Sequence, residues 1–546
     1  MNKKLLYQAL VVVLMILTFC LQNDSFIADG MESRNLTTAR EMLEKGNWFD
    51  PTMNGEYRFE KPPLPTWAAA LAMHIAGQDN MMVLRMPAAL SGMLLIYFLI
   101  RLCKELTADE LLPYLAAGTA ATSYLIMFAS RIITWDIFCH SFMLGAIWQL
   151  HIGLNASRNQ LRNFIASGIL MGLSFLSKGP IAFFVLLLPY LIARFFVYPN
   201  HDFKTKLKPW LLLIVITLVI SSAWPLYIYF QYPDVSQYVA NKESGAWINR
   251  HTKPFYYYWN FPLQSGVWAF LAGVSLIVPY ARKRVEEFGN YKLLLYWIAG
   301  AVILMSLFPE KKSRYLLPVM LPLAILTAFY LRYLIKAFKE SRFTKHDTLI
   351  FSVNNLLIAL ASLVAPFLLW KLFAKNGFDT TLSFKIMSVA ICWALSLALV
   401  RFTWTRQPLA AWLSVVVWVA STSLWLMGEA PKLLISNPGF RPYEALRHLD
   451  DTRALPFFSD GDLGGKFIEV VWGSGKEIHG WIPNNTPELP ITPPLVFFAD
   501  NAPSVSLPSS IRSHYDIQEL GLFDSNFRAN TYPMLKKYVV VIRNKR

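Results

Sequence analysis

The chain has 546 residues, of which 55% are hydrophobic and only 16% are charged, and its mean hydropathy is +0.37. Soluble domains carry about 25% charged residues, so this composition excludes an ordinary soluble protein and indicates a polytopic helical membrane protein. The formal net charge of +16 does not predict a nucleic-acid partner, because the basic residues cluster in short loops between apolar runs, where they determine topology.

The amino terminus carries Lys3 and Lys4 ahead of an unbroken apolar run. A signal peptide has the same pattern, but no small-x-small cleavage site follows Leu21. We therefore interpret the run as an uncleaved first span with a cytoplasmic amino terminus.

Thirteen membrane spans are predicted when two rules are applied together. A span needs about 20 apolar residues, and cytoplasmic loops collect Lys and Arg. The predicted spans lie near 5–22, 85–101, 111–128, 137–154, 164–177, 180–198, 210–229, 263–280, 292–308, 315–331, 348–370, 386–400 and 408–427. This path puts almost every basic loop on the cytoplasmic side; Lys311, Lys312 and Arg314 are the exception.

The first outer loop is predicted to span residues 23–84. Within it, the apolar run 64–77 is too short to cross a bilayer and suits a helix lying in the interface. Ahead of this run, Pro62 and Pro63 fix φ and withhold backbone donors, so they stiffen the segment that carries Glu60 and Lys61.

Two domains are predicted, a transmembrane domain over residues 1–428 and an α/β domain outside the membrane over residues 429–546. In the second, short β-rich runs alternate with Gly, Pro and Asn turns. These runs are residues 455–459, 467–472, 495–499 and 538–542. This domain shows no nucleophile, metal or phosphate-loop motif, so we expect a structural or acceptor-guiding role.

The predicted topology gathers acids and bases on the outer face. These residues are Glu32, Arg34, Glu60, Lys61, Arg131, Asp136, Lys178, Arg250, His251, Lys311, Lys312, Arg314 and Tyr315. Ionisable residues at span ends tend to mark a substrate path. A single Lys or Arg there is often a snorkelling anchor, but anchors do not call for carboxylates mixed with cations on one rim.

An outer cavity with this mixture suits a reaction on a lipid phosphate. Cations would neutralise the phosphate as it leaves, and a carboxylate would take a proton from an acceptor hydroxyl. Nucleotide sugars are scarce outside the cytoplasm, so a transferase there is expected to use a lipid-linked donor. Arg binds phosphate as a bidentate fork and Lys as a point charge.

The sequence resembles the GT-C glycosyltransferases that use polyprenyl-phosphate sugars, the protein O-mannosyltransferase superfamily, and most closely the bacterial lipid A aminoarabinose transferases. The matched motifs occur in the family's order over the whole chain. They are Ala39-Arg-Glu-Met42, Gly46-Asn-Trp48, Pro51, Asn54-Gly55, Glu60-Lys-Pro-Pro-Leu64, Trp67, Arg85-Met-Pro87, Asp136, Lys178-Gly-Pro180 and Arg314-Tyr-Leu-Leu-Pro318.

The resemblance implies a GT-C fold of about 13 transmembrane helices with outer juxtamembrane helices and a C-terminal extracytoplasmic α/β domain. It implies an inverting transfer of one sugar from an undecaprenyl-phosphate donor to lipid A, a protein or another glycan. The expected location is the periplasmic face of a bacterial inner membrane.

The resemblance also assigns roles to residues. Such enzymes carry an Asp-Glu pair in the first outer loop, with the Asp as proposed base, but this chain has Met31-Glu32 in register. Either Glu32 takes that role or Asp29 reaches the site after a local shift, and we favour Glu32. Asp136 is expected to be a second catalytic acid.

The remaining expected site residues bind the donor. Glu60 and Lys61 would line the donor cavity, Lys178 would face the phosphate, and Tyr315 would be a lid or headgroup contact. The others are Arg34, Tyr57, Arg131, Arg250, His251 and Arg314. Glu60 and His251 alone are a thin basis for a metal site, so no metal or other cofactor is predicted.

Two other functions are compatible with a lipid-linked sugar. A transporter or flippase would favour internal repeats and a binding site at the membrane midplane, and neither is visible here. An O-antigen ligase-like enzyme would concentrate its chemistry in one large late loop, whereas this chain concentrates it in the first.

Overall fold

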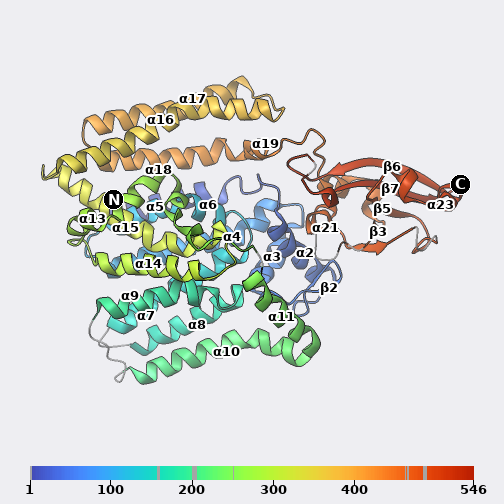
Figure 1. Cartoon of the computed structure of the whole chain (residues 1–546), viewed down its shortest axis with the longest axis horizontal. Coiled ribbons are helices and arrows are strands. Elements are labelled where there is room, and N and C mark those ends of the chain that lie inside the picture. The colour runs from blue at the N-terminus through green and yellow to red at the C-terminus, as the bar shows by residue number, and fades with distance from the viewer. Residues whose placement is uncertain are drawn as a thin grey trace.

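The computed structural model describes residues 3–155, 160–198, 206–249, 251–461, 463, 467–483, 488–529 and 531–545. Helices form most of the molecule, and a sheet near the carboxyl terminus lies at one end of them (Figure 1).

Each of the thirteen predicted spans coincides with a helix or a broken helix. In chain order they are α1 (Lys3–Met15) with η1 (Ile16–Cys20), α4 (Met81–Leu106), α5 (Leu112–Ala121) with α6 (Tyr124–Ser130), α7 (Trp135–Asn155), α8 (Gln160–Lys178), η2 (Phe183–Leu187) with α9 (Leu188–Val197), α10 (Leu207–Gln231), η4 (Phe261–Trp268) with α12 (Ala269–Ser275) and α13 (Val278–Val285), α14 (Tyr291–Leu307), η5 (Ser313–Leu316) with α15 (Leu317–Lys339), α16 (Lys345–Lys375), α17 (Leu382–Trp404) and α18 (Pro408–Trp425).

The described helices include seven that are long and apolar enough to cross a membrane, or nine if each of two bent pairs is one span. The bends are 67° between α5 and α6 and 93° before α13. The number of thirteen crossings therefore stays a prediction. Helices α7 and α15 are mostly buried and form the centre of the bundle, whereas α10, α16 and α17 expose most of their apolar surface.

The first outer loop contains two helices, α2 (Gly30–Glu44) and α3 (Leu64–Ala76). The helix predicted at 64–77 is α3, which has Pro65 in its first turn and ends at Gly77 with φ 77°. Helix α2 begins at Asp29, whose carboxylate accepts hydrogen bonds from the backbone N–H groups of Met31 and Glu32 at 3.0 and 2.8 Å. Such a side chain satisfies the free donors of a helix N-terminus.

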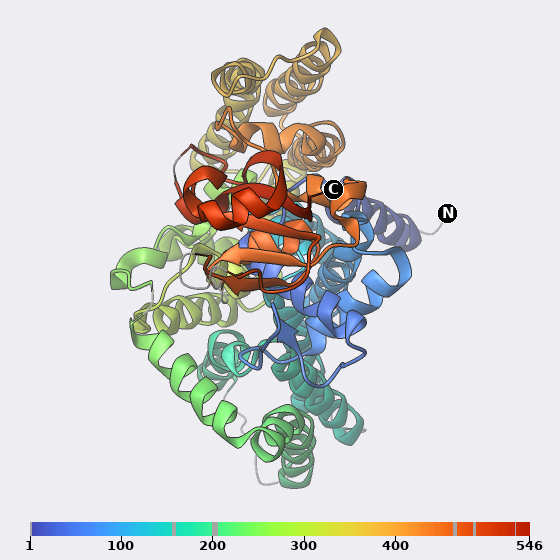
Figure 2. The same cartoon turned by 90° about the vertical axis from the view of Figure 1, so that its right-hand side faces the viewer.

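The carboxyl-terminal part holds a five-stranded sheet in the order β4-β3-β5-β7-β6. The strands are β3 (Phe457–Asp460), β4 (Ile478–Trp481), β5 (Leu495–Ala499), β6 (Tyr515–Asp524) and β7 (Lys536–Asn544). Strand β3 runs parallel to β4 and β5, while β7 runs antiparallel to β5 and β6. The sheet lies across the end of the helical bundle (Figure 2).

One of the four predicted β-runs is wrong. Residues 467–472 lie largely in helix α21 (Ile468–Ser474), which connects the parallel strands β3 and β4. Parallel strands need a crossover connection, usually a helix. Ile468, Val470 and Val471 of this run are buried in the core beside the sheet, so burial, and not strand formation, explains these apolar residues.

Helix α21 and strand β4 pack against the first outer loop. Arg40 of α2 donates to the carbonyl of Val471 at 3.1 Å. The side chain of Asn54 donates to the carbonyl of Ile478 at 2.9 Å and accepts from its N–H at 2.8 Å. Asn54 and Gly55 form the turn between β1 (Thr52–Met53) and β2 (Glu56–Tyr57), with φ of 55° and 80°. The Asn-Gly pair therefore both makes the turn and binds the sheet.

Replacing Asn54 by glycine is expected to loosen the sheet domain without breaking this turn. Glycine accepts a positive φ, but the two hydrogen bonds to Ile478 are lost, each with a net contribution of about 0.5–1.5 kcal/mol. Faster trypsin cleavage between residues 429 and 456 would be the measured result. Glu56→Ala, an exposed change in the same hairpin, should leave the cleavage rate unchanged; equal rates for both variants would contradict the prediction.

Candidate active site

A cavity of about 620 Å³ lies between α7, α8, α10 and α14, next to the segment 59–62 and to α11 (Pro233–Asn249). Its volume is typical of a small-molecule site. The lining residues are Phe59, Glu60, Lys61, Pro62, Asp136, His140, Phe175, Lys178, Gly179, Pro180, Ile181, Phe184, Val185, Trp224, Pro225, Ile228, Ser236, Val239, Ala240, Tyr258, Met305, Phe308, Glu310 and Tyr315.

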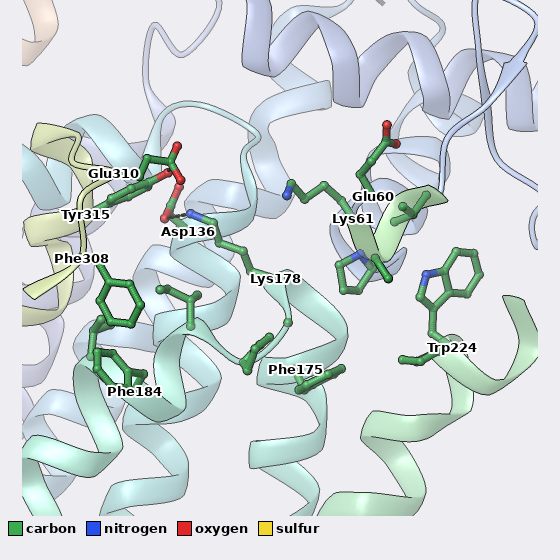
Figure 3. Close-up of a pocket in the computed structure, with 18 of the residues that line it drawn as sticks. Glu60, Lys61, Asp136, Phe175, Lys178, Phe184, Trp224, Phe308, Glu310 and Tyr315 are labelled. Atoms are coloured by element: carbon green, nitrogen blue, oxygen red, sulfur yellow. Dashed lines mark hydrogen bonds and ion pairs between the residues drawn. The ribbon is translucent and has the colours of Figure 1, made fainter. Parts of the chain in front are cut away.

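Asp136 and Lys178 form an ion pair at one end of the cavity (Figure 3). Asp136 lies in the first turn of α7 and Lys178 in the last turn of α8, where each charge complements its helix dipole. The ammonium of Lys178 also lies 5.0 Å from the centre of the Tyr315 ring. The pair is held by two helices and an aromatic ring, so its position is fixed before any ligand binds.

Glu60 and Lys61 enter the cavity from the first outer loop. Figure 3 shows the Lys61 side chain extending toward the Asp136–Lys178 pair. Glu60 accepts a hydrogen bond from Lys242 of α11 at 2.8 Å. Burial alone would raise the pKa of Glu60, but the hydrogen bond and charge of Lys242, with the charge of Arg58, outweigh burial and lower it. Glu60 is therefore a carboxylate at neutral pH.

Arg58 and Phe59 anchor this segment. The Arg58 guanidinium donates at 2.9 Å both to the carbonyl of Arg34 and to the hydroxyl of Thr38, and its central carbon lies 5.2 Å from the Trp135 ring. Phe59 is buried beside Trp224. With the prolines that follow, these contacts set the direction of Glu60 and Lys61.

The cavity is amphipathic. The charged side chains gather at one end, while Phe175, Phe184, Phe308 and Trp224 form apolar walls below them (Figure 3). A ligand with an anionic group joined to a hydrocarbon chain matches this division, because the cations face the anion and the aromatic walls bury the chain.

Three further lining residues were absent from the sequence-based site. Glu310 is 3.2 Å from the ammonium of Lys312 and accepts from the Tyr315 hydroxyl at 3.4 Å. Tyr258 had no predicted role; its hydroxyl accepts from the N–H of Lys312 at 3.1 Å. His140 follows Asp136 by four residues, and that spacing on a helix is the signal that would have placed it on the same face.

Glu32, the favoured base, does not line the cavity. Its side chain is fully buried, and its two oxygens accept from Nε and Nη2 of Arg85 at 2.8 and 2.6 Å. It also accepts from the N–H of Ile133 at 3.0 Å. A carboxylate that is buried and saturated with donors is poorly placed to take a proton from a substrate. The preference for Glu32 as the base therefore does not agree with the geometry.

The alternative base, Asp29, is exposed and is occupied as the N-cap of α2. Arg131 is also outside the cavity lining. It is buried, and its guanidinium donates to the carbonyls of Thr18, Leu21 and Gln22 at 2.5–2.9 Å. These contacts tie the loop before α7 to η1 and to the two residues that follow Cys20, and they indicate a structural role.

Three other predicted donor-binding residues, Tyr57, Arg34 and Arg314, do not line the cavity. Tyr57 is exposed and stacks on Phe59 with ring centres 5.5 Å apart. Arg34 lies on α2, where its carbonyl accepts from the Arg58 guanidinium at 2.9 Å. Arg314 lies 5.9 Å from the Tyr315 ring.

His251 is exposed, has φ 51°, and accepts at its carbonyl from the N–H of Lys311 at 3.2 Å. Arg250 lies outside the described residues. Among the residues that are described, no group of three or more His, Cys, Asp or Glu side chains is arranged to hold a metal ion. Metal independence stays a prediction.

Comparison with known proteins agrees with this architecture. The model of the dolichyl-phosphate-mannose-protein mannosyltransferase family matches residues 60–227. An undecaprenyl phosphate-alpha-4-amino-4-deoxy-L-arabinose arabinosyl transferase of Pseudomonas fluorescens is 25% identical over 79% of this chain and 73% of its own length. A relative of the same description from Edwardsiella ictaluri is 28% identical over 61% of this chain and 60% of its own.

The fold is that of solved membrane glycosyltransferases. The crystal structure of ArnT from Cupriavidus metallidurans bound to undecaprenyl phosphate superposes with a TM-score of 0.65 and 15% identity, covering 98% of this chain and 97% of that one. The archaeal oligosaccharyltransferase AglB from Archaeoglobus fulgidus superposes with a TM-score of 0.53 and 14% identity, covering 87% of this chain and 64% of that one. The chain is therefore a multi-pass membrane glycosyltransferase of the GT-C fold, and it is similar to the protein mannosyltransferases and the aminoarabinose transferases.

Proposed function

We propose that this protein transfers a sugar from undecaprenyl phosphate to an acceptor at the periplasmic face of a bacterial inner membrane. The observation that carries the proposal is the amphipathic cavity, in which Lys61 and Lys178 stand at the charged end above aromatic walls. The similarity of the chain to transferases whose names include undecaprenyl phosphate supports the same donor here.

In the proposed reaction, an acceptor oxygen attacks the anomeric carbon and forms a new glycosidic bond as the bond between that carbon and the phosphate oxygen breaks. The electron pair of the breaking bond stays on the lipid phosphate, where Lys61 and Lys178 stabilise the added charge. The acceptor proton passes to a carboxylate. Attack opposite to the leaving phosphate inverts the anomeric centre.

Asp136 is the carboxylate that we assign to the proton. In the free protein it is paired with Lys178, whereas Glu60 is paired with Lys242 and Glu310 with Lys312. A donor phosphate competes with Asp136 for Lys178, because a phosphate oxygen is also a strong acceptor. Donor binding therefore releases Asp136 at the moment when a proton acceptor is needed.

Lipid A is the acceptor that we propose, in line with the resemblance of the sequence motifs to those of the lipid A aminoarabinose transferases. The sheet domain, which we assign to residues 429–546, contacts α2 of the first outer loop through α21. This position suits an acceptor-guiding role. The transmembrane domain, residues 1–428, would then carry all groups that act on the donor.

The test is a transfer assay with the full-length protein in proteoliposomes. Synthetic undecaprenyl-phosphate sugars and lipid A are supplied, and products are identified by mass spectrometry alongside an Asp136→Asn control. Addition of one sugar to lipid A with release of undecaprenyl phosphate supports the proposal. Movement of the intact lipid-linked sugar between leaflets without transfer would instead assign a flippase and refute it.

Removal of divalent metals is expected to leave transfer essentially unchanged. Lys61 and Lys178 supply the positive charge that a metal would otherwise provide at the leaving phosphate. The measurement is the transfer rate before and after treatment with EDTA. A loss of activity that Mg²⁺, Mn²⁺ or Zn²⁺ restores would contradict this expectation.

A further inference from the structure

His140 is a cavity residue with an unsatisfied polar atom. It lines the cavity one helical turn after Asp136 on α7, and the residue is only 1% exposed. Among the described residues, its Nδ1 has no hydrogen-bond partner. Buried polar groups are nearly always paired, and leaving one unpaired costs about 1–3 kcal/mol. A ligand in the cavity would supply the partner that this atom lacks in the free protein.

A second histidine on the same helix gives the comparison. His151 is equally buried, but its Nδ1 lies 2.8 Å from the Tyr190 hydroxyl and its Nε2 lies 3.0 Å from the Asn155 amide. His151 does not line the cavity. Of these two buried histidines of α7, His151 has both nitrogens bonded and packs in the bundle, whereas His140 has an unpaired nitrogen and is among the residues that line the cavity.

The depth of His140 identifies the part of a ligand that it meets. Helix α7 begins at the charged end of the cavity with Asp136, and four residues advance about 6 Å along a helix. His140 thus lines the cavity one helical turn further from the charged end than Asp136. In an amphipathic ligand whose anion lies at that end, this level holds the oxygen atoms that join the anion to the hydrocarbon chain.

We propose that Nδ1 of His140 donates a hydrogen bond to a phosphate oxygen of the lipid-linked donor, on the lipid side of the group that Lys178 binds. The inference rests on the proposed function, since it takes its ligand from there. No bond is made or broken by His140; it positions the phosphate and acts equally on the donor and on the released lipid phosphate.

The experiment measures equilibrium binding of radiolabelled undecaprenyl phosphate to the full-length protein in nanodiscs. His140→Ala is expected to weaken binding about tenfold or more, the loss of one hydrogen bond to a charged group. His140→Asn places an amide nitrogen near the position of Nδ1 and should restore most of the affinity. His140→Gln places it near Nε2 and should not. His151→Ala, the buried control, should lower thermal stability without changing affinity.

The outcomes separate the two proposals. If His140→Ala binds the lipid as tightly as the wild type, the role of His140 is overturned but the proposed function is not. If His140→Asn and His140→Gln restore affinity equally, the assignment to Nδ1 is overturned. If His140→Ala does not fold, the comparison of Asn with Gln still decides. Failure of the wild-type protein to bind the lipid would overturn the proposed function and this inference together. Binding of radiolabelled inorganic phosphate as tightly as undecaprenyl phosphate would assign the site to free phosphate and overturn the lipid ligand.

Discussion

Replacing Lys178 by methionine is expected to lower the rate of sugar transfer by about 10²–10³-fold, the effect of removing one pre-positioned group that stabilises developing charge. Lys178 is a cavity cation that the structure holds in place through Asp136 and the face of Tyr315. Both kcat and kcat/KM should fall, because the charge on the leaving phosphate grows only in the transition state.

A lysine on the same aromatic ring provides the control. Lys312 lies 5.9 Å from the centre of Tyr315, compared with 5.0 Å for Lys178, but it does not line the cavity and is paired with Glu310. Lys312→Met should therefore leave the rate near that of the wild type. Equal losses for the two variants would show that general surface charge, and not the position of Lys178, supports the reaction.

The double variant Lys178→Met with Asp136→Leu guards against a folding artefact. Lys178→Met alone leaves the buried carboxylate of Asp136 without its partner, and an unpaired buried charge is destabilising. The double variant removes both charges, so it should be stable and still inactive. Recovered activity in that variant would exclude both residues from the chemistry.

The sequence was sufficient to predict where the helices lie. Each predicted span coincides with a helix or a broken helix, and the short run at 64–77 is helix α3, because long apolar runs separated by basic loops leave few alternatives. The secondary structure of the carboxyl-terminal sheet region was harder to predict. Residues 467–472 are apolar and β-branched enough for a strand, but they form the crossover helix between two parallel strands, and that role depends on strand order.

Only some of the residues that line or support the cavity could be predicted, because several of the partners are distant in sequence. Glu60, Lys61, Asp136, Lys178 and Tyr315 do meet in one cavity, as the placement of charges on the outer face predicted. The partner of Glu32 comes from a helix 53 residues away, and an ion pair of this kind leaves no local pattern. Lys242, which holds Glu60, was invisible for the same reason.

The role of Glu32 can be decided by treating it together with Arg85. Glu32→Gln and Arg85→Met should each lower the free energy of unfolding by about 3–5 kcal/mol, because each leaves one buried charge unpaired. The double variant Glu32→Met with Arg85→Met should recover most of that stability, since a buried ion pair replaced by apolar side chains is often neutral. Apparent Tm values of the purified proteins measure this. The exposed pair Arg282–Glu286 is the control, with an expected change of at most about 1 kcal/mol.

Activity of the double variant then separates structure from chemistry. If Glu32 only holds the segment before α7 through the N–H of Ile133, a stable double variant keeps most of its transfer rate, because Asp136 and Lys178 stay at the cavity. If Glu32 is the proton acceptor, the rate falls by about 10²–10⁴-fold even though stability returns. The first result would place the proton acceptor among the cavity carboxylates and favour Asp136. The second would mean that the Glu32–Arg85 pair opens during the reaction, since in the closed pair both carboxylate oxygens are occupied.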